Sequence, residues 1–227
     1  MTTLSISEAV ALVRKNLDEM DPNASVMYTD EGSDNFSLSD IITRNLPEAI
    51  NEVGLAAPVQ LLEGETIDFA TDQDAAVDVS DDGVLSVSLP PSSGFLRLVA
   101  FKAADSPVVV TDILAEASPE GRKQLNPYIR GRWDRPRLVS VQGEHTGPEF
   151  RYYTLDKPED YAGDPASAIS LFSFLKEQSF KPGDMGYDIP RRLKSNIIDC
   201  LTAKVLETYS DQRAQSFYQK ASIFPNI

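Results

Sequence analysis

The sequence predicts an α+β protein in which a helical scaffold, formed by the N- and C-terminal segments, holds an inserted antiparallel β-rich domain. Three observations support this prediction. Apolar residues recur at helical spacing near both ends, they alternate with polar residues between turn signals in the middle, and 227 residues suffice for one large domain or two small ones. We place the scaffold in residues 1–58 and 182–227 and the β-rich domain in residues 59–181. The two ends of the chain must then pack together.

Two helices are expected before the β-rich domain. Ser5–Met20 begins with a capping-box pattern and carries an apolar stripe on one face. Ser37 with Asp40 opens a second helix, which Gly54 should close. Pro47 should kink this second helix or divide it in two, because proline lacks a backbone N–H donor.

The middle of the chain has strand patterns separated by turns. Ser80–Gly83 reads as a hairpin turn, and Phe95–Ala103 reads as a strand buried on both faces. One or two helical turns should begin at Ser118, with Pro119 in the first helical position. The strands that we expect are Val77–Val79, Val84–Leu89, Phe95–Ala103, Leu138–Gln142, Phe150–Leu155 and Ala168–Leu175, with a further short one at Val108–Ile113.

The C-terminal segment should contain the longest helix, from Asp188 to Phe224. Asp188 can cap its N-terminus, and Pro190 falls in its first turn. The apolar stripe is weakest around Gln212–Gln215.

Composition excludes several classes of protein. The apolar share of 41% and the charged share of 25% are typical of a soluble globular protein. No apolar run approaches the ~20 residues of a membrane span, and the N-terminus does not resemble a signal peptide. Cys200 is the single cysteine, so an internal disulfide and a cysteine-based zinc site are excluded. We expect a protein made in a reducing cytoplasm.

Charge is distributed unevenly along the chain, whose net charge is −14. Residues 122–137 hold six basic residues and one acid, for a net +5, whereas residues 1–121 hold five basic and 22 acidic residues, for −17. Residues 138–227 contribute −2, from ten basic and 12 acidic residues. The basic stretch includes the only tryptophan, Trp133, and the only histidine, His145, follows it. Such polarity suits two surfaces that attract each other across copies of the chain.

Several short motifs in and after this stretch resemble those of a known family. Asn126-Pro-Tyr-Ile-Arg-Gly131 is followed by Arg135-Pro136, by the strand patterns and by a C-terminal segment, Arg192–Leu206, of the form R-L-x-x-x-I-x-x-x-L-T-A-x-V-L. This combination resembles head–tail connector proteins of tailed bacteriophages, especially ring proteins of crAss-like phages. The resemblance implies a helical bundle with a β insertion, twelve copies in a ring beneath the portal, and no catalytic residues.

The basic stretch is the candidate subunit interface. We expect its cations and tryptophan to dock on the acidic half of a neighbouring copy, because arginine and tryptophan are enriched in interface hot spots. Local ion pairs of ~0–1 kcal/mol each are one alternative, and phosphate binding with base stacking is another. The acidic remainder of the chain argues against the latter. The interface residues are Arg130, Arg132, Trp133, Arg135 and Arg137.

A second contact surface is expected near the C-terminus. Arg191 and Arg192 would oppose the dipole of the predicted helix, so either water screens them or they meet an acidic partner such as the portal. Phe224 and Ile227 lie in an apolar tail that can gain order on binding a neighbouring component.

We identify no catalytic, cofactor-binding or metal-binding residues. The aspartates at 72 and 74 fall short of an EF-hand pattern and suit turns better. His145 has no nucleophile motif nearby and no second histidine, which favours a polar turn residue over a catalytic base. Cys200 reads as a small core residue. A glycosidase-type carboxylate pair stays open, because acids are abundant.

We therefore expect a structural virion protein without enzymatic activity. It would be a head–tail adaptor, in a ring that is dodecameric in the resembling family, with portal protein and a tail or second adaptor protein as partners. DNA would pass through the channel without sequence-specific binding, and no membrane partner is expected. The alternatives are a monomeric carbohydrate-binding or carbohydrate-active β domain, and a tail or baseplate subunit.

Overall fold

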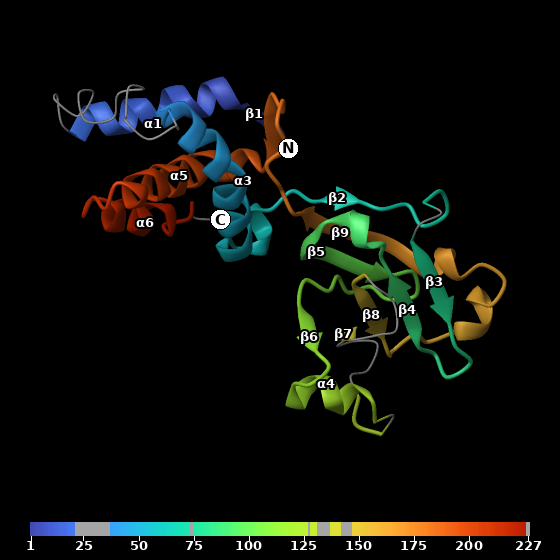
Figure 1. Cartoon of the computed structure of the whole chain (residues 1–227). Helices are drawn as coiled ribbons and strands as arrows, with labels where there is room; N and C mark the ends of the chain where they lie inside the picture. The colour runs from blue at the N-terminus through green and yellow to red at the C-terminus, as the bar shows by residue number, and fades with distance from the viewer. Residues whose placement is uncertain (21–36, 73–74, 127, 131–136, 142–146, 226–227) are drawn as a thin grey trace. The chain divides into compact units, whose positions relative to one another are not determined.

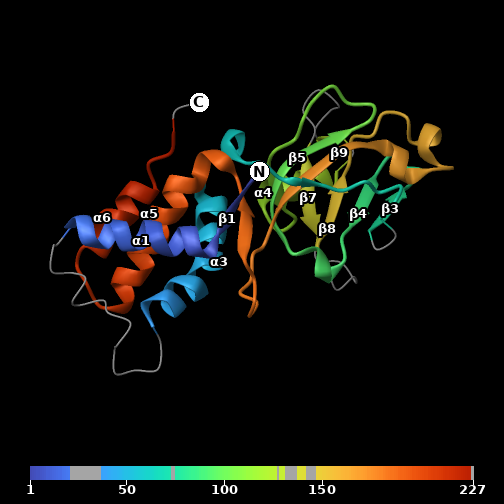
Figure 2. The same ribbon diagram turned by 90° about the horizontal axis from the view of Figure 1, so that it is seen from above.

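A computed structural model describes residues 1–20, 37–72, 75–126, 128–130, 137–141 and 147–225 (Figures 1 and 2). The fold is α+β, as the sequence predicts. The chain forms two compact units, one from residues 1–63 and 177–227 and the other from residues 64–176. We call these the helical unit and the β unit. The sequence predicts boundaries after residues 58 and 181, whereas the units of the structure divide after residues 63 and 176. In the described part of the chain, no helix is long and apolar enough to span a membrane.

The helical unit packs α1 and α3 against the C-terminal helix α5, which also contacts α6. The capping signals of the first two helices act as predicted: Glu8 N donates to Ser5 Oγ (3.2 Å), and Ser37 and Asp40 complete the second capping box. A two-stranded antiparallel ribbon joins the ends of the unit. Its elements are β1 (Thr2–Ser5), α1 (Ile6–Met20), α3 (Leu38–Ala56), η1 (Val59–Leu61), β10 (Gly186–Ile189), η5 (Arg191–Leu193), α5 (Lys194–Thr208) and α6 (Ala214–Ala221).

The second helix differs from expectation at two positions. Helix α3 passes through Pro47 as one element, and Pro47 is buried among the apolar residues of that face. Gly54 lies inside the helix, which ends at Ala56. Ala57 takes an extended backbone (φ −66°, ψ 146°), because a residue before proline avoids the helical conformation. The stop signal is therefore Pro58 rather than the glycine.

The prediction of one helix from Asp188 to Phe224 is wrong. Asp188 belongs to strand β10, where its Oδ1 accepts from Thr3 Oγ1 (2.7 Å), so it caps no helix. The helical stretch then breaks after Thr208, where Ser210 adopts φ 56°, and α6 turns back along α5. The break lies next to the weak part of the apolar stripe. After the break, α6 packs its own apolar residues against α5.

The β unit contains two sheets. The first has the order β2-β9-β5 and the second the order β3-β4-β8-β7-β6, in which β6 and β7 run parallel and the other pairs antiparallel. The second sheet is thus mixed, whereas a purely antiparallel domain was expected. The strands are β2 (Glu65–Thr66), β3 (Ala76–Val79), β4 (Leu85–Ser88), β5 (Phe95–Ala103), β6 (Ile113–Ala115), β7 (Leu138–Val141), β8 (Glu149–Tyr152) and β9 (Ile169–Lys176).

Both sheets contribute to one core. Phe101 from β5 packs on Tyr152 from β8 and on Phe172 from β9, with ring centroids 5.3 and 6.2 Å apart. Only three residues of β5 are buried, so the expectation that this strand is covered on both faces is wrong. The strand expected at Val108–Ile113 forms later, as β6, with an isolated bridge from Val110 to Phe101. The remaining strands and the Ser80–Gly83 hairpin turn are confirmed to within a few residues.

Short helices complete the β unit: η2 (Pro91–Ser93), α4 (Pro119–Gln124), η3 (Pro158–Tyr161) and η4 (Pro165–Ala168). Helix α4 begins where predicted, because Ser118 Oγ accepts from Gly121 N (3.0 Å) and Pro119 occupies the first turn.

Candidate subunit interface

The basic stretch connects two neighbouring strands of the second sheet. Strand β6 precedes α4, and β7 pairs with β6 from Leu138 onward. Gly121 holds α4 close to the end of β6, since a Cβ there would lie 2.1 Å from Ala115 O. We call residues 119–137 the arm. Its described residues are 119–126, 128–130 and 137, so the predicted interface residues Arg132, Trp133 and Arg135 lie outside the described residues.

The arm exposes apolar side chains that the sequence reading did not single out. Tyr128 is 94% exposed, and Leu125 and Ile129 are also exposed. Asn126 organises the turn that carries them: its Oδ1 accepts from Tyr128 N (3.0 Å), and its carbonyl oxygen accepts from Ile129 N (3.1 Å) and Arg130 N (2.9 Å). These hydrogen bonds tie Tyr128, Ile129 and Arg130 to Asn126, and Tyr128 faces solvent. An aspartate or asparagine two residues before an exposed aromatic is the sequence signal that could have found it.

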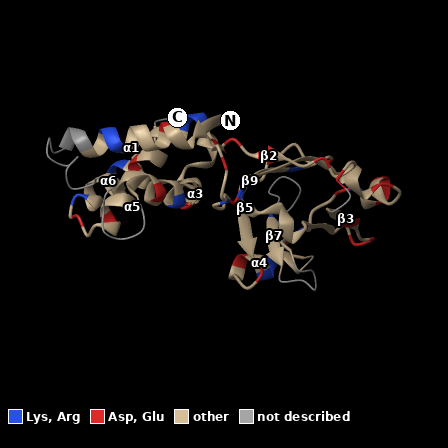
Figure 3. Cartoon of the chain, turned by 45° about the horizontal axis from the view of Figure 1, so that its top comes forward, with Lys and Arg blue, Asp and Glu red and all other residues tan. Residues whose placement is uncertain are grey.

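Cations surround these apolar residues. Arg122, Lys123 and Arg137 are exposed, and Arg130 is partly buried. Among the ion pairs of the described residues, none involves Arg122, Lys123 or Arg130. Figure 3 shows the basic colour on α4. Apolar and cationic side chains that are exposed together form the kind of patch that binds an acidic, partly apolar surface.

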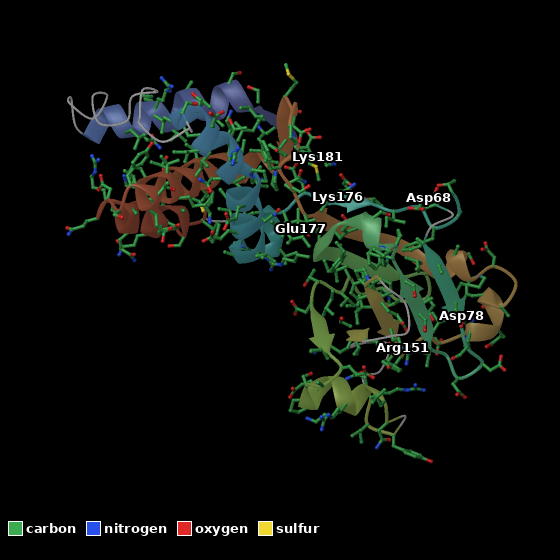
Figure 4. The ribbon with its side chains drawn as sticks, viewed as in Figure 1. Asp68, Asp78, Arg151, Lys176, Glu177 and Lys181 are labelled. Carbon is green, nitrogen blue, oxygen red and sulfur yellow. The ribbon has the colours of Figure 1, made fainter. Side chains whose placement is uncertain are left out.

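The same unit carries an acidic region, which we call the acidic end. Residues 67–84 contain six acids and no basic residue, and residues 155–165 contain four acids and one lysine. The two stretches meet, because Leu155 N donates to Gly83 O (3.3 Å) and η4 contacts both β3 and η3. Figure 4 places Asp68 and Asp78 on the side of the β unit away from α4. The arm and the acidic end are thus two separate surfaces of one unit.

The acidic end contains a hollow of about 400 Å³. The loop after β2 forms one wall, and η4 with the start of β9 forms the other. Asp68 and Asp164 are exposed at the hollow, and Phe69 is partly buried beside them. In the described part of the chain, no cluster of three or more histidine, cysteine or acidic side chains has a metal-binding arrangement.

The predicted partner-contact residues occupy the helical unit. Arg191 and Arg192 are exposed in the 3₁₀ turn η5. They precede α5 rather than lying inside a longer helix, and the next cation is neutralised locally, since Lys194 Nζ donates to Glu8 Oε1 (2.6 Å). Phe224 is partly buried and lines a cavity of about 80 Å³ between α3, α5 and α6. Ile227 lies outside the described residues.

A polar cluster on the helical unit was missed by the sequence reading. Lys204 Nζ lies 3.1 Å from Glu48 Oε1 and 2.8 Å from Glu52 Oε2, and its side chain is 12% exposed. Burial alone would lower the pKa of Lys204, but the bonds and charges of the two glutamates outweigh it and hold the pKa above its usual value. Tyr218 OH donates to Glu207 Oε2 (2.7 Å), and burial with this bond raises the pKa of Tyr218. This cluster links α3, α5 and α6 and is structural.

The other residues that the sequence analysis considered are Cys200, Asp72, Asp74 and His145. Burial raises the pKa of Cys200 to about 12, and Cys200 lies in the core as expected. Asp72 is described, whereas Asp74 and His145 lie outside the described residues. Comparisons with protein-family models, with curated proteins and with solved structures found no match.

Proposed function

We propose that this protein is a structural subunit that assembles head to tail, with the arm of one copy on the acidic end of the next. Two different patches on one unit make a heterologous contact, which closes into a ring when the rotation between copies permits. In a tailed-phage virion, such a ring would be a head–tail connector between the portal and the tail. The predicted dodecamer, the virion location and the portal and tail partners belong to this proposal.

The observation that carries the proposal is the exposed arm. Tyr128 is 94% exposed, and it lies near Arg122, Lys123 and Arg130, none of which takes part in the ion pairs of the described residues. Tyrosine, tryptophan and arginine are enriched in interface hot spots, and the arm exposes Leu125 and Ile129 beside Tyr128. Because the rest of the chain carries −19 when the +5 stretch is subtracted from −14, a second copy supplies the complementary surface.

The net charge also fits a channel for DNA. A ring built from acidic subunits repels the phosphate backbone, so DNA would slide through without adhering. Arg191, Arg192, Phe224 and Ile227 would then contact the portal or a tail component from the helical unit. This assignment separates two roles: cations of the arm for ring formation, and cations of η5 for neighbours in the virion.

The test is the oligomeric state of charge-reversed variants. We expect the wild type to form oligomers in light scattering, and the triple variant Arg130→Glu, Arg132→Glu and Arg135→Glu to be monomeric with an unchanged circular dichroism spectrum. Arg191→Glu with Arg192→Glu is the matched control and should assemble normally. An oligomer that survives the triple reversal would contradict the proposal. Imaging of the assembly with a count of subunits decides between a ring and a filament.

A second variant tests the arm without changing its charge. Gly121→Ala places a Cβ against Ala115 O, so α4 must shift from the end of β6. We expect weaker assembly with intact cations. Assembly equal to that of the wild type would show that the position of α4 is irrelevant to the contact.

A further inference from the structure

The hollow of the acidic end combines an apolar wall with carboxylates. Phe69 packs edge-on against Phe172, with centroids 5.6 Å apart and the ring planes at 89°. Asp68 and Asp164 contribute charge from opposite walls. A hollow of about 400 Å³ lies within the range of ~300–1,000 Å³ that is typical of ligand pockets.

Backbone hydrogen bonds fix both walls of the hollow. Ile67 N donates to Phe172 O (3.1 Å), which joins the loop after β2 to strand β9. Asp68 Oδ1 accepts from Ala70 N (3.1 Å), and Asp164 O accepts from Ser167 Oγ (2.7 Å). Each aspartate therefore sits on a turn that is closed by its own hydrogen bond. The shape exists before any ligand binds, so little ordering entropy is lost on binding.

We infer that this hollow receives Tyr128 and Arg130 from the arm of a second copy. This inference rests on the proposed head-to-tail assembly and names its contact. The tyrosine ring would pack against Phe69, as aromatic pairs do at centroid separations of ~4.5–7 Å. The guanidinium of Arg130 would bind Asp68 and Asp164. When these carboxylates are ionised, they accept hydrogen bonds and donate none.

Charge and position both favour a second copy as the occupant. The carboxylates of the hollow repel phosphate and nucleic acid, and they attract a cation that also brings an aromatic ring. The arm offers both, in Arg130 and Tyr128. Figure 1 places α4 and Figure 4 places Asp68 at different ends of the β unit, so α4 does not cover the hollow of its own unit. The spacing of Tyr128 and Arg130 is set by the turn on Asn126.

The experiment compares two variants with the wild type by sedimentation velocity at ~150 mM salt, where exposed charges beyond ~8 Å are screened. The hollow variant carries Asp68→Lys and Asp164→Lys. The matched control, Asp112→Lys with Glu177→Lys, makes the same change in net charge at two exposed acids that lie outside the acidic end and the arm. We expect self-association at least about tenfold weaker in the hollow variant, as for loss of a hot spot, and within about threefold of wild type in the control.

A charge exchange tests whether the two sites meet. Arg130→Asp alone should weaken self-association, and Arg130→Asp combined with Asp68→Lys should restore it by at least about tenfold, because the ion pair is rebuilt with reversed sign. Failure of the exchange, with both single variants weakened, would overturn the pairing of these residues. Tyr128 replaced by p-benzoylphenylalanine should photo-crosslink to residues 66–70 or 164–172 of another copy. Crosslinks elsewhere would also overturn the inference.

The outcomes separate this inference from the proposed function. A wild-type protein that stays monomeric up to the highest soluble concentration overturns both. Oligomers of the wild type that persist in the hollow variant overturn the hollow as the receptor but leave head-to-tail assembly standing. Binding of malto- or cello-oligosaccharides to the hollow, seen by calorimetry and lost in the hollow variant, would assign the hollow to a sugar if self-association stays unchanged in that variant.

Discussion

The helical unit and the arm of the β unit use the same residue types in opposite ways. On the helical unit, Lys204 is 12% exposed between two glutamates, and Lys220 Nζ lies 4.6 Å from the ring centroid of the buried Phe217. On the arm, Tyr128 is 94% exposed, and Arg122, Lys123 and Arg130 take part in none of the ion pairs of the described residues. Cations and rings of the first kind stabilise the fold, whereas those of the second kind are available to a partner. Composition alone does not distinguish the two.

The largest expected effect compares one aromatic residue from each region. Phe217→Ala removes a buried ring from α6 and should lower the free energy of unfolding of the helical unit by ~3–5 kcal/mol. Tyr128→Ala, the matched change on the arm, should stay within ~0.5 kcal/mol. Urea denaturation followed by circular dichroism measures both, with the transition of each unit fitted separately. An equal loss of unfolding free energy in the two variants would contradict the distinction between the helical unit and the arm.

The next effect concerns how the helical unit closes at its C-terminus. Asn196 is 3% exposed, and its Nδ2 donates to Ala221 O (2.8 Å) and Ile223 O (2.9 Å). Asn196→Ala leaves two carbonyl groups without this donor and should cost ~1–3 kcal/mol. We also expect faster amide exchange at the end of α6, because the chain after it is released. Unchanged exchange would show that packing of Phe224 is sufficient to hold this segment.

A smaller effect compares two lysines. Lys204→Ala removes a packed aliphatic stem together with two ion pairs and should lower stability by ~1–2 kcal/mol. Lys123→Ala on the arm should change stability by no more than ~0.5 kcal/mol. Thermal unfolding monitored by circular dichroism ranks the two variants. A cost for Lys123→Ala as large as that for Lys204→Ala would mean that the arm is held by its own charges.

The smallest effect depends on pH. Burial raises the pKa of Asp199 above its ordinary 3.8, partly offset by Lys220, so the folded protein binds this proton more tightly than the unfolded chain does. Stability from this group is present at low pH and falls as pH rises through the folded pKa. Asp199→Asn should therefore raise stability at pH 7 by up to ~0.5 kcal/mol after solvent screening. The gain should vanish below pH 3.8, and a gain independent of pH would contradict this origin.

Local signals predicted most elements, because their causes are local. The capping residues Ser37 and Ser118 begin helices where the sequence places them, and Ser80–Gly83 closes its hairpin with Gly83 at φ 75°. Each of these features depends on a few consecutive residues and their own backbone preferences. The ends of elements were harder to predict. Gly54 was a plausible stop signal, but the constraint from Pro58 acts two residues beyond it.

Features that join distant parts of the chain could not be predicted from the sequence. Asp188 looked like a helix cap because nothing nearby reveals that β10 pairs with β1, at the opposite end of the sequence. The parallel pairing of β6 with β7 and the lysine between Glu48 and Glu52 are of the same kind. The hollow between residues 66–70 and 164–172 also joins distant segments.

The sequence by itself determined the α+β class, the two sets of terminal helices and the concentration of positive charge in residues 122–137, because periodicity and charge are properties of neighbouring residues. Only the tertiary structure decided which cations are buried in pairs, that Tyr128 is the most exposed aromatic of the described arm, and that the acids of two separate stretches share one surface. Burial and pairing depend on which segments meet in space, and that choice is made by the packing of the whole unit.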